Sequence, residues 1–411
     1  MARLVEVINS GSSSIKYQLF DLADPAAPVV WAAGLVEAIG EPGSRLTHRT
    51  RIGLGPTADF AESVHDVDLP DHAAGFAAIT AAFDRTGPIA DIGEVVAFGH
   101  RVVHGGSVFA APAVVDDDVL AAIADCIPLA PLHNPANLAG IVGAMAAHPG
   151  VPNVAVFDTA FHQSMPASAY TYAIDVDVAR EHRIRKYGFH GTSHAYVSRV
   201  AVAHLGLDPA TARVVTLHLG NGASTCAIAG GRSIDTSMGL TPLAGLVMGT
   251  RCGDIDPAIP VHLQRTAGMT ADDVDDLLNK RSGLKGLCGA NDLREIHAAA
   301  DTGDAAAQLA LDVYARRVRS YLASHLVDLG GADVIVFTAG VGENDARLRR
   351  RSLAGLEFLG IAVDNDRNEL VSSAERRIPM VIINGRMTPR SFPRWQKLRG
   401  TISALLECFD L

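Results

Sequence analysis

The chain has 411 residues, of which 48% are hydrophobic and 19% charged. Its 35 basic and 45 acidic side chains give a net charge of −10, which argues against a nucleic-acid backbone or an anionic membrane as its main partner. At about 100 to 200 residues per domain, this length predicts two or three domains with large cores. No uninterrupted apolar run reaches about 18 residues and the first residues lead directly into a strand, so we expect neither a membrane span nor a secretory signal.

Cysteine usage indicates a reducing compartment. The five cysteines are scattered and form no C-x-x-C pair. We therefore expect free thiols in a cytoplasmic protein. They are Cys126, Cys226, Cys252, Cys288 and Cys408.

Two strand–turn–strand units stand about two hundred residues apart. Residues 4–22 contain a serine-rich turn at 9–14, and residues 213–229 contain a glycine-rich turn at 220–224. Both turns carry a Gly and a Ser two positions apart, which favours a duplicated domain. A third apolar run, 333–338, leads through glycines into a charged helical stretch, a geometry typical of phosphate or nucleoside binding.

Helical periodicity alternates with these strands, which predicts an α/β protein with mixed or parallel sheets. The expected helices cover residues 73–85, 117–125, 192–204, 270–279 and 305–329.

The glycine-rich turns favour an anion site, although the commonest phosphate motifs are absent: the chain has neither a P-loop nor a complete G-x-G-x-x-G sequence. Each turn alone is typical of a tight hairpin. Three such turns with Asn and Ser side chains, and with Lys16 beside the first, favour a nucleoside triphosphate held between two lobes.

Four polar residues outside these turns are candidates for binding or catalysis. Arg101 can bind a carboxylate or phosphate bidentately, or it can pair with a nearby Asp as a structural ion pair. Asp158 ends an apolar strand, where functional groups of α/β sheets collect, or it caps a helix. His190 and Arg251 lie near glycines, which lets a ligand approach; a lone His is also commonly structural.

These residues suit phosphoryl transfer, which requires positioning and charge neutralisation. No G-x-S-x-G, H-E-x-x-H or Cys/His zinc pattern is present, so hydrolase and zinc functions are disfavoured. Cys252, beside Arg251, is interpreted as a space-filling residue because no base is assigned to it.

Nine segments in order, from residue 4 to about residue 370, resemble the acetate kinase family. They are residues 9–16, 99–106, 131–135, 157–163, 187–194, 218–224, 235–239, 248–257 and 337–344. The resemblance implies a duplicated two-domain, actin-like ATPase fold with ribonuclease H-like α/β domains and the active site in the interdomain cleft. We expect an N-terminal lobe over 1–155, joined by a C-terminal helix at 390–411, and a C-terminal lobe over 156–385.

The resemblance also implies roles for individual residues. Asp158 would be the catalytic carboxylate, and His190 and Arg251 would stabilise the transition state. Arg101 would bind acetate, with Val103, Phe189 and His133 also in the substrate site. Asn9 would help to place Mg2+, or Mn2+ in its stead. ATP would be bound by Ser12, Ser14, Lys16, His218, Leu219, Gly220, Asn221, Gly222, Asp292, Leu293, Arg294, Gly340, Val341, Gly342, Glu343 and Asn344.

The C-terminus departs from the family pattern, which closes with an acidic segment that serves the Mg2+ site. Residues 376–406 contain no Asp or Glu and many basic residues. One interpretation is an unrelated or frame-shifted segment after about Gly385. The other is a genuine helix, because apolar residues from Trp395 to Phe409 recur at steps of three and four.

The leading hypothesis is a cytoplasmic acetate kinase, a homodimer by family likeness, that acts on acetate and ATP with Mg2+ and binds neither nucleic acid nor membrane. One rival is a propionate or other short-chain carboxylate kinase, because a pocket discriminates one methylene by only about 1 to 3 kcal/mol. The other rival is a nucleotide-binding homologue that is impaired in catalysis by its altered C-terminus.

Overall fold

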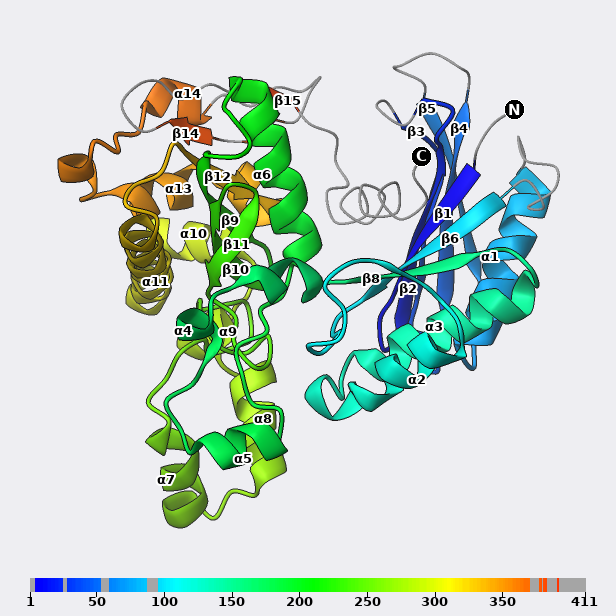
Figure 1. The fold of residues 1–411 in the computed structure, drawn as a ribbon, viewed down its shortest axis with the longest axis horizontal. Helices are drawn as coiled ribbons and strands as arrows, with labels where there is room; N and C mark the ends of the chain where they lie inside the picture. Colours follow the sequence, from blue (N-terminus) through cyan, green and yellow to red (C-terminus); the bar gives the residue numbers. More distant parts are fainter. Residues whose placement is uncertain are drawn as a thin grey trace. The chain divides into compact units, whose positions relative to one another are not determined.

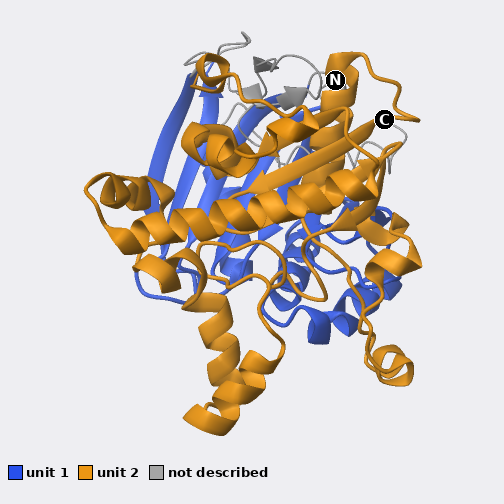
Figure 2. Cartoon of the chain, turned by 90° about the vertical axis from the view of Figure 1, so that its left-hand side faces the viewer, with its two compact units in different colours: residues 1–160, 397–411 blue, residues 161–396 orange. Residues whose placement is uncertain are grey.

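The computed structural model divides after Ala160 into two compact units (Figures 1 and 2). It describes residues 4–24, 28–52, 59–86 and 95–369, and the backbone of 377–378, 380–382 and 390–391. Of the helix expected over 390–411, the first two residues form strand β15, Arg390–Ser391. The rest of that segment lies outside the described residues, as do the apolar positions from Trp395 to Phe409.

The first unit is built on a mixed sheet with the order β5-β4-β3-β2-β1-β6-β8-β7. Its strands are β1 Leu4–Ser10, β2 Ser14–Asp21, β3 Val29–Glu37, β4 Arg45–Ile52, β5 Asp59–Asp66, β6 Val95–Val102, β7 Ala113–Val114 and β8 Asn153–Phe157. Strands β1 to β5 form an antiparallel meander, whereas β1, β6 and β8 run parallel. Strand β8 is apolar from Val154 to Phe157, and β1 is apolar from Leu4 to Ile8 except for Glu6, as strands in parallel pairs commonly are.

Helices pack on this sheet through side chains at helical spacing. They are α1 His72–Thr86, α2 Asp117–Asp125 and α3 Asn134–Ala147. Phe76, Ile79 and Phe83 recur at i, i+3 and i+7 on α1, so they form one apolar face. That face shares a core with strand residues that include Ile8 and Ile15.

The second unit has a five-stranded sheet with the order β11-β10-β9-β12-β14 and a small β13–β15 pair. Its strands are β9 Arg213–Leu219, β10 Ala223–Ala229, β11 Arg232–Thr236, β12 Val334–Thr338, β13 Arg377–Ile378 and β14 Met380–Ile382. Its helices are α4 Ala167–Tyr170, α5 Val176–Glu181, α6 Gly191–Leu205, α7 Ala258–Ala267, α8 Ala271–Lys280, α9 Gly283–Cys288, α10 Leu293–Asp301, α11 Ala305–Asp328, α12 Ala339–Asn344, α13 Ala346–Leu353 and α14 Asn365–Glu369. Helices α6 and α11 lie on opposite sides of this sheet (Figure 1).

The two sheets repeat one topology. In the first, β3-β2-β1 is an antiparallel meander whose β1 pairs in parallel with β6. In the second, β11-β10-β9 is a meander whose β9 pairs in parallel with β12. The predicted α/β class and its duplication are thereby confirmed.

Other expectations from the sequence can be compared directly with the structure. All five predicted helices are present as α1, α2, α6, α8 and α11. The four cysteines among the described residues are free thiols, and Cys408 lies outside them. In the described part of the chain, no helix is long and apolar enough to cross a membrane.

Glu6 on β1 predicts an unusual pH dependence of stability. Its side chain is buried, Oε1 has no hydrogen-bond partner, and burial raises the pKa of the carboxyl to about 8. The unfolded chain ionises Glu6 from about pH 4.5, whereas the folded chain keeps it neutral, so the free energy of unfolding falls as pH rises from about 4.5 to about 8.

We expect Glu6→Gln to remove this pH-dependent loss. Between pH 5 and pH 8, the free energy of unfolding of wild type should fall relative to that of Glu6→Gln by on the order of 3 kcal/mol, because each pKa unit corresponds to about 1.4 kcal/mol. Urea denaturation at the two pH values measures the difference. The exposed Glu41→Gln is the control. Parallel pH dependence in wild type and Glu6→Gln would contradict the assignment.

Candidate active site

Three polar residues of the first unit meet at one edge of its sheet. Because β1, β6 and β8 are parallel, Asn9, Arg101 and Asp158 follow one another across their carboxyl ends. The Arg101 guanidinium donates to Asp158 from Nε at 3.0 Å and from Nη2 at 2.5 Å, and its Nη1 donates to Asn9 Oδ1 at 3.1 Å. The structure therefore joins the predicted acetate-binding, catalytic and metal-placing residues of this unit in one cluster.

The Arg101–Asp158 pair is almost fully removed from water. The side chains are 13% and 1% exposed, respectively. Burial acts to lower the pKa of Arg101, but the adjacent Asp158 outweighs it and raises that pKa. The structural alternative predicted for Arg101, an ion pair with a nearby Asp, is therefore present. The bidentate geometry also fixes the plane of the guanidinium, which is what recognition of a second carboxylate requires.

Two buried asparagines of α3 hold the backbone beside this cluster. Asn137 accepts from the Val103 amide at 2.9 Å and donates to the Ser10 carbonyl at 2.7 Å, so it ties β1 to the segment after β6. Asn134 binds both the amide and the carbonyl of His104. Asn137 had no predicted role. The available signal was two asparagines three positions apart, which a helix places on one face.

The serine-rich turn at 9–14, which was predicted to bind phosphate and is named the first phosphate turn, closes between β1 and β2. The Gly11 amide donates to the Ser14 carbonyl at 2.7 Å, and the exposed Lys16 lies opposite Asn9 in the β1–β2 register. Ser12 is exposed and Ser14 half-buried. This arrangement leaves the Lys16 ammonium accessible to an anion near the cluster.

Val103, His133 and Phe189 were expected around the substrate. Val103 is buried in the first unit, and His133 is the half-buried residue before α3. Phe189 is buried in the second unit.

Two segments that were predicted to bind ATP leave one edge of the second sheet. They are the turn at 220–222, named the second phosphate turn, and the segment 339–344, named the nucleoside turn, which the structure folds as the short helix α12. Parallel β9 and β12 place His218 opposite Thr338 in register, so residues 220–222 and 339–344 begin side by side. A Cβ on Gly220 would lie 3.7 Å from that of Ala339. The segments predicted to bind ATP around His218 and Gly340 are thus neighbours, as expected for turns at the carboxyl ends of parallel strands.

His190 is held in a left-handed backbone conformation before α6, with φ of +58°. Gly188 also has positive φ, and a Cβ there would lie 2.5 Å from Thr236 Cγ2, so this approach requires glycine. His190 Nδ1 lies 2.8 Å from Ser224 Oγ, and its ring stacks on His218 with a centroid separation of 4.2 Å. A strained backbone fixed in this way is characteristic of functional sites.

Arg251 lies at the same turn as His190. A Cβ on Gly222 would be 3.6 Å from both Arg251 Nη atoms and 3.7 Å from His190 Cε1. Arg251 Nη1 also donates to the Pro242 carbonyl at 2.9 Å. The structure therefore brings the two predicted transition-state stabilisers to the second phosphate turn.

The segment 292–294 has a structural role at the surface. Asp292 caps α10 by accepting from the Arg294 amide, and the exposed Arg294 guanidinium pairs with the same carboxylate. Hydrogen bonds from Arg294 lower the pKa of Asp292 to about 2. Leu293 is buried. The nucleotide-binding role of this segment stays a prediction.

Arg349 on α13 binds the backbone of the nucleoside turn, a role that was not predicted from the sequence. It is buried, and its Nη1 donates to the carbonyls of Gly342 and Glu343 at 2.9 Å. Its Nε and Nη2 bind the side-chain and backbone oxygens of Asn368. Burial lowers the pKa of Arg349 to about 10. In the sequence it is one of three consecutive arginines, and nothing distinguishes the buried one.

Comparison with known proteins identifies the family. The acetokinase family model matches residues 4–385. The chain belongs to the acetokinase family. An acetate kinase of Clavibacter michiganensis is 57% identical over 373 residues, which are 91% of each chain.

Solved structures agree with this membership. A Porphyromonas gingivalis acetate kinase has a TM-score of 0.88 and 39% identity with full coverage of both chains. A propionate kinase of Francisella tularensis has a TM-score of 0.87 and 37% identity, and the alignment covers 97% of this chain and 98% of that one.

The end of the chain is similar to a different family. The model of 3-deoxy-D-manno-octulosonic-acid transferase matches residues 367–411. The match overlaps the acetokinase match only over residues 367–385. This second match agrees with the change of composition after about Gly385.

We expect Arg349→Met to weaken ADP binding at least tenfold, because the carbonyls of Gly342 and Glu343 lose their shared donor and the turn is no longer fixed. Isothermal titration calorimetry measures the affinity. The matched control is Arg350→Met, because the more exposed Arg350 pairs with Glu369. Equal ADP affinity in both variants would refute this role for Arg349.

Proposed function

We propose that the protein is an acetate kinase. It transfers the γ-phosphoryl group of ATP directly and in line to a carboxylate oxygen of acetate, and gives acetyl phosphate and ADP in a reversible reaction. The observation that carries this proposal is the Asn9–Arg101–Asp158 cluster at one sheet edge, in which Asp158 is buried. A guanidinium fixed in its plane suits a carboxylate acceptor. Family membership supports the same reaction.

In the first unit, Arg101 binds the acceptor carboxylate and Asp158 acts as the catalytic carboxylate. The bidentate contact holds the Arg101 fork before acetate arrives, so little ordering is required on binding. Val103 contributes apolar surface for the methyl group.

In the second unit, His190 and Arg251 stabilise charge on the transferring phosphoryl group. The turns at 218–222 and 340–344 hold the nucleotide, and Lys16 of the first unit binds phosphate. Because a phosphoryl transfer joins two anions, positive groups fixed in advance contribute most of the catalysis.

The oxygen donors of Asn9 and Asp158 suit Mg2+, which in proteins commonly takes one or two carboxylates, phosphates and waters. Bound Mg2+ would neutralise phosphate charge during transfer. The side-chain oxygens of Asn9 and Asp158 already accept hydrogen bonds from Arg101, and residues 376–406 supply no carboxylate. We infer that Asn9 and Asp158 hold the ion with water, and that they hold it weakly.

We therefore expect the Mg2+ concentration for half-maximal activity to be several-fold higher than in a chimera that carries the family-type acidic segment in place of residues 385–411. The reason is the additional carboxylate that the chimera gains. A Mg2+ titration of initial rates measures it. Identical Mg2+ curves for the two proteins would show that the missing carboxylate has no consequence.

Acyl-phosphate formation tests the proposal. Hydroxylamine traps the acyl phosphate made from acetate, ATP and Mg2+. We expect robust product from wild type, a loss of at least a hundredfold in kcat for Asp158→Asn, and at least a tenfold rise in KM for acetate for Arg101→Ala. The control is Arg45→Ala, which removes an exposed ion pair with Asp66 on the same sheet.

The possible outcomes separate the candidate functions. ATP binding without any acyl phosphate would support a catalytically impaired homologue. A propionate reaction with the higher kcat/KM would favour the propionate kinase reading, which the similarity to the Francisella tularensis structure keeps open. We further propose a homodimer located in the cytoplasm, a compartment in which the free thiols stay reduced.

A further inference from the structure

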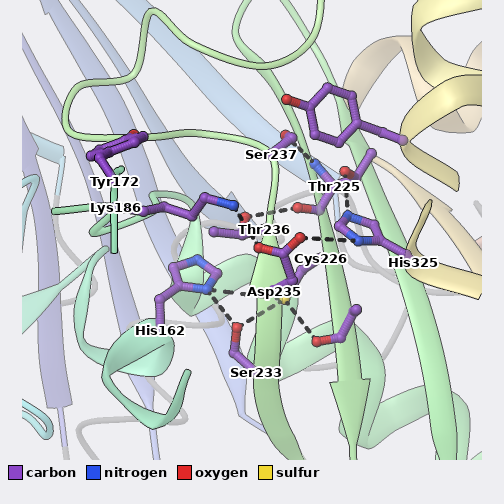
Figure 3. A network of polar contacts seen from close by, with 12 residues as sticks. His162, Tyr172, Lys186, Thr225, Cys226, Ser233, Asp235, Thr236, Ser237 and His325 are labelled. Atoms are coloured by element: carbon purple, nitrogen blue, oxygen red, sulfur yellow. Dashed lines mark hydrogen bonds and ion pairs between the residues drawn. The ribbon is translucent and has the colours of Figure 1, made fainter. Parts of the chain in front are cut away.

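A second polar cluster lies between the sheet and α11 in the second unit. Asp235 on β11 and His325 and Asp328 near the end of α11 each offer one donor atom, and these atoms lie within 4.8 Å of one another. Figure 3 shows the His325 ring directed toward the Asp235 carboxylate. None of the three residues has a role in the proposed phosphoryl transfer.

His325 is the unusual member because its buried Nδ1 has no hydrogen-bond partner. Its Nε2 lies 2.8 Å from Thr225 Oγ1, whereas Nδ1 lies 3.8 Å from Asp235 Oδ2. Burial lowers the pKa of His325 to about 4, so the ring is neutral near pH 7. If Nε2 donates its proton to Thr225, the Nδ1 lone pair faces a carboxylate oxygen, and two acceptors then oppose each other at 3.8 Å.

The charges around this gap are not balanced. Lys186 Nζ binds Asp235 Oδ1 at 2.6 Å, which leaves Oδ2 for another partner. Asp328 is exposed and adds a second carboxylate, and partial burial and the nearby Asp235 raise its pKa. Two carboxylates, one ammonium and a neutral imidazole leave an excess of negative charge.

We propose that Asp235, His325 and Asp328 form a binding site for a divalent transition-metal ion such as Zn2+, with water completing the coordination. Ligand distances of about 2.0 to 2.2 Å place two ligand atoms up to about 4.2 Å apart across an ion, so the 3.8 Å gap between His325 and Asp235 accommodates one. A mixed imidazole and carboxylate set suits Zn2+, Co2+ or Ni2+ better than Mg2+. The site is therefore distinct from the Mg2+ site of the kinase reaction.

The surroundings of His325 fit a ligating histidine. Such a residue commonly donates its second ring N–H to an oxygen, which fixes the tautomer and aims the lone pair at the metal, and Thr225 Oγ1 is in that position. Thr225 precedes Cys226 on β10. Burial raises the pKa of the Cys226 thiol far above its usual range, so Cys226 does not compete as a thiolate ligand.

Metal binding to the chelator-treated full-length protein, without nucleotide or Mg2+, tests the site. We expect Zn2+ titration calorimetry to show a site in wild type whose affinity falls at least tenfold in Asp328→Asn. Asp328 is exposed, so this substitution leaves the core intact. The control is Asp312→Asn, which removes another exposed carboxylate of the same helix. Acetyl phosphate formation with Mg2+ alone should be unchanged in Asp328→Asn, which separates this proposal from the proposed function.

Co2+ provides a second readout because its visible absorption reports the ligand set. We expect His325→Gln to lose the wild-type Co2+ band, and we expect Zn2+ to raise the Tm of wild type but not of Asp328→Asn. Equal Zn2+ affinity in wild type and Asp328→Asn would overturn the proposal. In that case the other histidines and cysteines of the chain account for the binding.

Discussion

Parallel pairing of the first strand of each meander is the constraint on which the polar cluster of each unit depends. In the first unit it carries Asn9, Arg101 and Asp158 to one sheet edge, where one guanidinium contacts the other two side chains. In the second unit it sets the turn after His218 beside the turn after Thr338. Neither grouping could form if the paired strands ran antiparallel, because their carboxyl ends would then lie at opposite edges.

Burial gives the Arg101–Asp158 pair its chemical character. Removing two charges from water costs several kcal/mol per ion, and the bidentate contact must offset that cost. The pair is thus weak evidence for stability and better evidence for a role in binding. Asn137 and Arg349 act differently, because they satisfy backbone groups of the segments beside which ligands would bind. Both units therefore combine a segment at the carboxyl ends of parallel strands with a buried polar side chain that fixes its backbone.

The sequence predicted the elements that carry strong periodicity or a glycine-rich turn. It found β1, β2, β9, β10 and β12, the five helices and the duplicated topology, because apolar runs and spacing determine these directly. It did not find β3 to β5. Exposed positions and polar residues weaken the strand pattern of β4 and β5, whereas β3 is an apolar run that was not singled out. It named Arg101 and Asp158 separately, but their pairing depends on strand register, which one sequence does not encode locally. Arg349 and His325 were missed because the residue type alone does not indicate whether a polar side chain is buried.

The proposed reaction requires that a carboxylate oxygen of acetate becomes bonded to the transferred phosphorus. Acetate labelled with 18O in both oxygens tests it in the presence of unlabelled ATP and Mg2+, with the product observed by 31P NMR. We expect the acetyl phosphate signal to show the upfield isotope shift of an 18O atom bonded to phosphorus, and we expect Arg101→Ala to slow the appearance of this signal. Nucleotide hydrolysis to unlabelled inorganic phosphate, with no shifted acetyl phosphate signal, would contradict the proposed reaction.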